Sequence, residues 1–579
     1  MTHLRLATLS ILLLLGLGAC GKSEEAATPE VSDTAAALLS YVPADTPYLA
    51  GSLEPPPEDV IEAMLTRAEP VLSEMQNQLS RAKSNMEGAD QGSLDDDPGA
   101  RLVLAMLEEL DGKLSREGFT SLGFDPAGDK VFYGMGAFPV ARFGLSDAAV
   151  FRATVQRILE RAEMTAPEQV FQDVSYWRLG DGGHDEPLAM YVAIIGDHLA
   201  VSLFPHAEEA GLLPAFLGVT MPSDSNAQQR LTALNAKYGY SPYGSGIFDV
   251  HKLADQFLDP DTALARLMAA EGDFNAAELA PECSAEVHEI IDNFPMMSAG
   301  TTILAVDSIE YQYRVHHPQT LAGELMELVA EIPAAESLSR RLMEFSFGMR
   351  FGAVRDFLRD KANAIVADPY QCEQLADLNL RAEEALVQLN QPMPPLVNNF
   401  RGVRASLAEF VMDPGQAIPQ KAHGHLAVHV EQPQMFVGMA QMMLPDLSEL
   451  ALVPGEPPVA IPETLMPIPG AVAFAAMTDE SIGMSLGAGE EAGLPAFLDR
   501  KNGPAGVFLS VDYDMAAYIE YTDRVSQAAG SEHGHQQNDA AQAIAEAAQE
   551  AIVAAADRSH TALSFSGDGL VIEGHMTFK

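Results

Sequence analysis

The chain has 579 residues, of which 47% are hydrophobic, so it can bury a sizeable core in about two to four domains. Its 82 acidic and 34 basic residues give a formal net charge of −48. Such a surface repels the phosphates of nucleic acids and the anionic headgroups of lipids, which excludes nucleic acid as a partner.

The chain begins with an export signal. Arg5 provides a positive charge, and residues 6–17 form an apolar run that is shorter than the roughly 20 residues needed to cross a bilayer as a helix. Leu-Gly-Ala-Cys follows and resembles the lipobox of bacterial lipoproteins, which implies that residues 1–19 are removed and that Cys20 is acylated. More than one acyl chain gives durable attachment to a membrane.

Residues 20–40 are predicted to be the lipidated tether, because they are mostly polar after Cys20 and lack a hydrophobic period. Gly21 follows the cysteine, where an aspartate would resemble an inner-membrane retention signal. The sequence therefore favours the outer membrane of a Gram-negative envelope, with the protein facing the periplasm or the surface.

The body is predicted to be α+β, with two related halves at residues 41–318 and 421–579. Residues 190–203 and 472–486 each read as two strands joined by a tight turn, and a similar helix sequence follows at 208–217 and 490–498. Each copy continues with a further strand and short helix and ends in a hairpin-like pair of strands. Four elements in one order predict an internal repeat with antiparallel sheets and flanking helices.

Residues 319–420, between the two halves, are predicted to be a helical middle segment. Apolar residues recur there at three- and four-residue steps, and we find no strand signal. The residues that carry this period are Leu325, Leu328, Val329, Leu338, Leu342, Phe345 and Met349.

Two cysteines remain once Cys20 is lipidated, namely Cys283 and Cys372. In an oxidising envelope compartment a leftover pair indicates a disulfide, which here closes a loop of about 90 residues and contributes roughly 4.5 kcal/mol in the chain-entropy model.

Two groups of residues are candidates for binding. Tyr238, Tyr240 and Tyr243 cluster in a Gly/Pro-containing loop, where aromatic rings either line a ligand site or pack a turn. The second group joins strand histidines to methionines of the next helix, an arrangement that either binds copper or places exposed histidines beside a methionine-filled core. Its members are His423, His425, Met435 and Met439.

Residues 41–48, Tyr-Val-Pro-Ala-Asp-Thr-Pro-Tyr, open the ordered body. This Val-Pro-Ala-Asp-Thr signature resembles the start of proteobacterial envelope lipoproteins grouped under a domain of unknown function. The segments around Phe138, Cys283 and Cys372 are also similar to that family. The family has no assigned activity, so the resemblance assigns no functional residue.

We find no nucleophile elbow and no phosphate-binding loop in the sequence. Our leading hypothesis is therefore a non-enzymatic lipoprotein without a cofactor that binds a protein, peptide or lipid partner. A hydrolase with an unfamiliar site and a periplasmic copper-binding protein are the alternatives.

Overall fold

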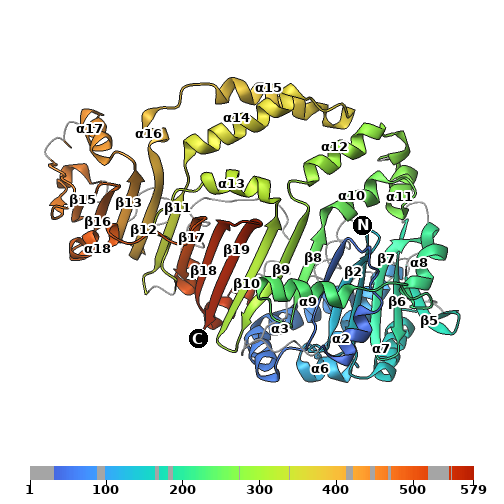
Figure 1. Ribbon diagram of the computed structural model, residues 1–579. Helices are drawn as coiled ribbons and strands as arrows, with labels where there is room; N and C mark the ends of the chain where they lie inside the picture. Colours follow the sequence, from blue (N-terminus) through green and yellow to red (C-terminus); the bar gives the residue numbers. More distant parts are fainter. Residues whose placement is uncertain are drawn as a thin grey trace. The chain divides into compact units, whose positions relative to one another are not determined.

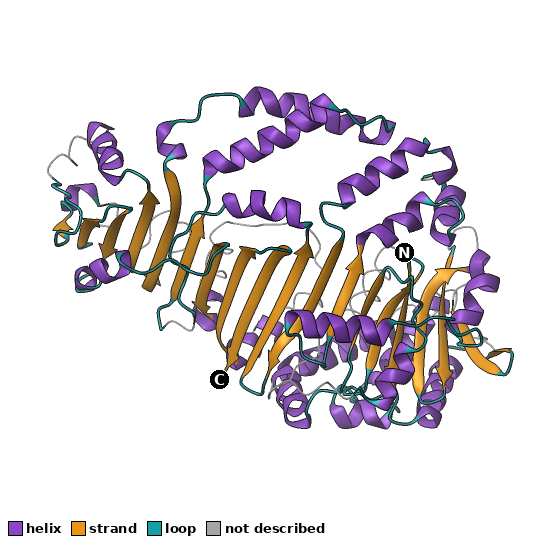
Figure 2. Ribbon diagram, in the orientation of Figure 1, coloured by secondary structure: helices purple, strands orange, loops and turns teal. Residues whose placement is uncertain are grey.

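The computed structural model describes residues 31–87, 98–163, 168–179, 187–272, 274–337, 340–411, 421–443, 447, 450–466, 471–519, 547–549 and 551–579 (Figure 1). The fold is α+β, as predicted, with antiparallel strand pairs and many helices (Figure 2).

The chain divides into two compact units whose boundaries differ from those of the predicted halves. The first unit takes its described residues from Met1–Leu279, Met296–Tyr311 and Gln537–Ala551, and the second from Ala280–Pro295, Gln312–Gln536 and Ile552–Lys579. None of the described helices combines the length and the apolar character needed to cross a membrane.

The sheet of the first unit has nine strands in the described residues. These are β1 (Tyr48–Gly51), β2 (Lys130–Met135), β3 (Phe138–Gly144), β4 (Gln169–Phe171), β5 (Val174–Leu179), β6 (Leu188–Ile195), β7 (His198–Pro205), β8 (Ser245–Asp249) and β9 (Met296–Leu304). Their order across the sheet is β9–β8–β1–β2–β3–β7–β6–β5–β4. The short strand β1 therefore lies inside the sheet.

One face of this sheet carries the main core of the first unit. Helices α2 (Asp33–Leu39), α8 (Glu209–Phe216) and α9 (Ala227–Tyr238) supply apolar side chains to it. Alternate residues of the strands point to the same side, so every second strand residue joins this core. Among its buried members are Leu38, Leu49, Val131, Tyr133, Val140, Tyr191, Phe204, Phe216 and Leu231.

The opposite face is covered near β5 and β6, where α5 (Pro98–Leu110) and α7 (Ala148–Arg161) pack around the buried Leu159, Trp177 and Ile194. The carboxylate of Asp147 begins α7 by accepting hydrogen bonds from the first backbone N–H groups of the helix. The other helices of this unit are α3 (Glu58–Glu87), α6 (Arg116–Ser121), α10 (Val250–Leu258) and α11 (Ala263–Glu271).

The second unit contains further antiparallel strands, which we call the second sheet. The strand β10 (Ser308–His316) has residues in both units and pairs with β9 and with β19. The strands of the second sheet are β11 (Met343–Gly348), β12 (Phe400–Val411), β13 (Lys421–Val430), β14 (Val459–Ala460), β15 (Ala473–Met477), β16 (Ser481–Leu486), β17 (Val507–Asp514), β18 (Ala556–Phe565) and β19 (Gly569–Phe578). The order is β19–β18–β17–β11–β12–β13–β16–β15–β14.

The buried face of the second sheet is largely polar. Glu344 on β11 accepts hydrogen bonds from Arg500 and Ser406, and Asp512 on β17 binds Arg558. The helix α18 (Leu494–Leu498) packs its leucines on β13 and β15 at this face. The apolar residues on the other face of β11, such as Phe345 and Phe347, are only half-buried.

The prediction of a wholly helical middle segment at residues 319–420 is wrong. It contains two whole strands, β11 and β12, which pair with each other. The predicted helical positions Phe345 and Met349 belong to β11 and to the residue after it. The sequence Met-Glu-Phe-Ser-Phe-Gly alternates apolar and polar side chains, which is the period of a strand.

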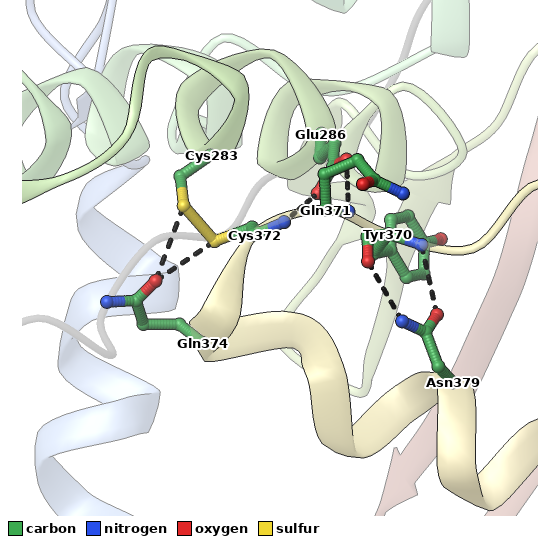
Figure 3. The surroundings of a disulfide bond; sticks show 7 residues. All are labelled: Cys283, Glu286, Tyr370, Gln371, Cys372, Gln374 and Asn379. Atoms are coloured by element: carbon green, nitrogen blue, oxygen red, sulfur yellow. Dashed lines mark hydrogen bonds between the residues drawn. A yellow bond between two sulfur atoms is a disulfide. The ribbon is translucent and has the colours of Figure 1, made fainter.

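Helices fill the rest of this segment. α14 (Phe351–Ala367) and α15 (Ala376–Leu389) form a helical hairpin, which we call the α14–α15 hairpin. Its turn is joined to α12 (Pro281–Ile291) by a disulfide between Cys283 and Cys372, both of them buried (Figure 3). The remaining helices of the second unit are α13 (Gln319–Glu327), α16 (Pro395–Asn398) and α17 (Pro433–Met443).

Polar contacts reinforce the disulfide (Figure 3). The Glu286 carboxylate accepts hydrogen bonds from the backbone N–H groups of Gln371 and Cys372, at 2.7 and 2.9 Å. The side-chain amide of Gln374 lies against both sulfur atoms, with Oε1 at 3.3 Å and 3.1 Å. The bridge and these contacts hold the turn of the hairpin against α12.

Candidate functional site

An open apolar area lies on the first sheet, on the face opposite the main core. It consists of Tyr48 and Ala50 on β1, Phe132 on β2, Phe248 on β8 and Met297 on β9, and we call it the open face. Phe132 is 43% exposed and Met297 is 44% exposed. Ala50 is also exposed, although β1 is an inner strand, so no part of the chain that the structure describes covers this area of the sheet.

The register of the strands places three of the larger side chains of the open face in a row. Tyr48 pairs with Phe248, and Phe248 pairs with Met297 on the next strand. The ring of Tyr48 stacks on Phe132 and on Phe248, with centroids 5.5 Å and 6.2 Å apart. Its hydroxyl donates to the carbonyl of Ala137 at 2.9 Å, which fixes the ring, and burial raises the pKa of Tyr48.

A second row, of small residues, runs beside the aromatic row. Ala50 pairs with Gly246, and Gly246 pairs with Ala299. A Cβ atom at Gly246 would come within 3.0 Å of the Ala50 side chain. Because glycine has no side chain, the backbone of β8 is left uncrowded at this point of the row. Phe132 pairs with Ala50, so its ring stands at the β2 end of this second row. The open face thus has a low row of small residues over β1, β8 and β9, which we call the trough, with Tyr48, Phe248 and Met297 along one side.

A polar cluster is centred on Glu209 at the start of α8. Its carboxylate accepts hydrogen bonds from Tyr176, Tyr191, Arg178 and the Nδ1 atom of His206, at 3.2, 3.1, 3.1 and 2.8 Å. Burial raises the pKa of Glu209, but the hydrogen bonds outweigh it, so the pKa lies below its ordinary value. A carboxylate that orients a histidine is a feature of general-base sites. Here both tyrosine hydroxyls bind the carboxylate, which is the pattern of a satisfied structural network.

A buried guanidinium caps α8 from β3. Arg142 is fully buried and donates to the carbonyl of Phe216 at 2.6 Å, to the Tyr133 hydroxyl at 3.1 Å and to Nε2 of His198 at 2.9 Å. It also lies 3.9 Å from the ring centre of Tyr41. A cation at the last carbonyls of a helix is favourable, so Arg142 ties α8 to the sheet.

The second unit also has a buried arginine that donates to a carbonyl at the end of a short helix. Arg404 on β12 donates to the carbonyl of Phe497 at 3.1 Å, and Phe497 and Phe216 occupy matching positions in the repeated helix sequence. His429 lies buried beside Arg404, as His198 does beside Arg142. Neither arginine is accessible to a ligand, so both sites serve the fold.

These histidines should make the protein sensitive to acid. Burial and the neighbouring arginine lower the pKa of His198 to about 3 and that of His429 to about 4. Both folded-state values lie below the ordinary 6.5, so the stability from the neutral rings is complete above pH 6.5. It is lost as pH falls towards 4 and 3. At pH 5 each of the two rings should lower the free energy of unfolding by about 2 kcal/mol relative to pH 7.

Urea unfolding at pH 7 and pH 5, followed by fluorescence of the single Trp177, measures this loss in the first unit. His198→Gln keeps an acceptor for Arg142 but does not titrate. We expect it to remove about 2 kcal/mol from the difference between the two pH values. An equal pH dependence in wild type and variant would contradict the assignment.

The predicted histidine and methionine group lies on β13 and α17. His425 is buried, donates from Nε2 to the backbone oxygen of Glu490 at 2.7 Å, and stacks on Phe497. His423 is half-exposed and lies 3.5 Å from the Glu409 carboxylate. Met435 and Met439 are half-buried on α17. Within the described residues, no three His, Cys, Asp or Glu side chains are grouped as a metal site.

The predicted tyrosine cluster forms the end of α9 and the turn after it. Tyr240 is buried against Leu234 and Ile247, and its ring lies 5.7 Å from that of Tyr238. Gly239 between them takes the left-handed conformation that ends the helix. Tyr243 is half-buried, and burial raises its pKa. The structure thus brings Tyr238 and Tyr240 together in a packed turn.

Cys20, the predicted lipidation site, lies outside the described residues. The open face was not found from the sequence, because its members come from four segments that are far apart along the chain. Comparison with protein-family models, with curated proteins and with solved structures finds no match for this chain.

Proposed function

We propose that this protein is a lipid-anchored outer-membrane protein of the bacterial envelope, without enzymatic activity, whose open face holds the acyl chain of a lipid. The observation that carries the proposal is the exposure of Phe132, Ala50 and Met297 over the inner strands of a sheet. Exposed apolar patches of this kind mark binding surfaces, because leaving them in water is unfavourable.

The size of the open face favours an acyl chain over a folded protein. Five residues form it, with Gly246 and Ala299 beside them, whereas a stable protein interface uses about 20 to 30 residues on each side. Neighbouring strands are about 4.8 Å apart, so the trough over three strands is about 10 Å long. Each methylene that leaves water contributes about 0.8 kcal/mol to the free energy of binding. The methylenes that lie in the trough together give a favourable free energy of binding.

The net charge of the protein indicates which lipid headgroups it can approach. The net charge of −48 opposes anionic headgroups, so a neutral or zwitterionic lipid fits this protein best. Acylation of Cys20 would place the body beside such lipids. The anchor rests on the sequence of the leader and of residues 17–20, and the outer-membrane location rests on Gly21 after the cysteine.

Photocrosslinking in intact cells tests the proposal. With p-benzoylphenylalanine in place of Phe132 in the full-length protein, irradiation should attach a lipid to the peptide that contains residue 132. Mass spectrometry identifies the adduct. The same spectra should show an acylated Cys20 as the first residue, and a retained leader would contradict the anchor alone.

Two controls keep the result specific. The same substitution at Val170, which is 65% exposed on β4, should give no lipid adduct. Ala50→Asp puts a charge into the trough at an exposed position and should abolish the adduct at residue 132. A protein adduct, or equal labelling at residues 132 and 170, would refute lipid binding.

A further inference from the structure

The α14–α15 hairpin has a surface that is unusual for a water-exposed pair of helices. In each helix only one side chain is buried, Ala362 in α14 and Ala382 in α15. Large apolar side chains are left in water on both helices. They are Leu358, Val366, Leu378, Leu380 and Val387, with exposed fractions of 48%, 41%, 38%, 54% and 66%.

The two most exposed of these apolar side chains lie on the outer side of α15. Leu380 and Val387 are seven residues apart, so they lie on one side of the helix, about 10 Å apart along its axis. That side is opposite Ala382, which faces α14. Val387 also borders a shallow, open depression that Arg381, Glu384, Ala385 and Gln388 line and that Leu380 does not reach.

Carboxylates border this apolar surface. Glu383 and Glu384 make no salt bridge in the described part of the chain, while Arg381 is paired with Asp377 at 2.7 Å. Glu384 also interacts electrostatically with Arg381. The surface therefore offers two apolar anchors beside two carboxylates that carry more negative charge than the single Arg381 near them can balance. It belongs to the second unit, whereas the open face belongs to the first.

We propose that the outer side of α15 binds a cationic amphipathic helix of a partner protein. A partner helix with apolar residues at i, i+3 or i+4, and i+7 matches the spacing of Leu380 and Val387. Lysines or arginines on the flanks of the partner helix would lie beside Glu383 and Glu384, so charge complementarity requires the partner helix to be positively charged. The surface is independent of the proposed lipid site.

Binding of a designed probe tests this inference. The probe is a fluorescent 18-residue leucine/lysine amphipathic peptide, and a leucine/glutamate peptide with the same apolar pattern is its charge control. Fluorescence anisotropy with the full-length protein at about 0.15 M salt gives the Kd. The lysine peptide should bind and the glutamate peptide should not.

Matched variants separate the surface from the overall charge. Leu380→Ser with Val387→Ser should raise the Kd about fivefold or more, whereas Val170→Ser, at a similarly exposed position, should leave it unchanged. Glu383→Gln with Glu384→Gln should raise the Kd about threefold. Glu62→Gln with Glu69→Gln makes the same charge change at exposed positions of α3 and should have little effect.

All four variants replace exposed side chains, and unchanged circular dichroism verifies that they fold. If the serine pair binds the lysine peptide as tightly as wild type, or if both glutamine pairs weaken binding equally, attraction by net charge explains the binding. Either result overturns the proposal.

Discussion

Arg142→Met should lower the free energy of unfolding of the first unit by about 3 kcal/mol. The variant keeps an apolar stem of similar length but removes the donors that reach Phe216, Tyr133 and His198. Hydrogen bonds to a charged group contribute about 1.5–3 kcal/mol each, and groups left unpaired in the core add a penalty. Relief from burying a charge offsets part of this loss.

Trp177 reports this change, because it is the single tryptophan and lies buried in the first unit. Urea unfolding of wild type and variant, followed by its fluorescence, gives the difference in free energy. Arg266→Met is the matched control, since Arg266 forms an exposed ion pair with Glu208 and should cost less than about 1 kcal/mol. Equal effects of the two variants would show that Arg142 does not cap α8.

The strands that the sequence predicted well are those with strong local turn signals. Residues 190–203 form β6 and β7 as expected, and Gly196 in their turn has a φ of 56°, which glycine adopts at little cost. The hairpin-like pairs at the end of each predicted half are present as β9 with β10 and β18 with β19. In these segments local chemistry and tertiary structure agree.

Other features depend on packing that no local pattern contains. His425 was assigned to an exposed strand edge or a copper site, yet α18, which begins about 70 residues later, covers it. The open face joins β1, β2, β8 and β9, and its residues share no local motif. β11 was missed because it is only six residues long and lies between helices.

The relation between the two halves remains a prediction, which the strand pairing supports. Several strand pairs of the first series have a counterpart in the second: β1–β2, β2–β3, β3–β7 and β1–β8 correspond to β11–β12, β12–β13, β13–β16 and β11–β17. The arginines that bind Phe216 and Phe497 come from β3 and β12, which are not equivalent strands in this comparison. The contact is thus similar in kind but made from a different strand.

Replacing both Cys283 and Cys372 by alanine should loosen the α14–α15 hairpin more than any other described element. The hairpin buries only Ala362 and Ala382, and the start of α14 packs Ala353, Val354 and Phe357 against a leucine cluster that includes α13. The end of the hairpin near Cys372 therefore depends most on the disulfide. The disulfide closes a segment of 89 residues, which is worth about 4.5 kcal/mol in the chain-entropy model. Without it, the contacts of Glu286 with the hairpin turn remain but cannot replace that constraint.

Hydrogen exchange followed by mass spectrometry measures the effect. Amides of α14 and α15 should exchange more than a hundredfold faster in the double variant, whereas those of β6 and β7 in the first unit should keep their protection. Reduction of the wild type should give the same pattern, because it breaks the same disulfide bond without any change of amino-acid sequence. If the double variant keeps wild-type protection in α14 and α15, packing rather than the disulfide holds the hairpin. The partner-binding surface on α15 would then not depend on oxidation.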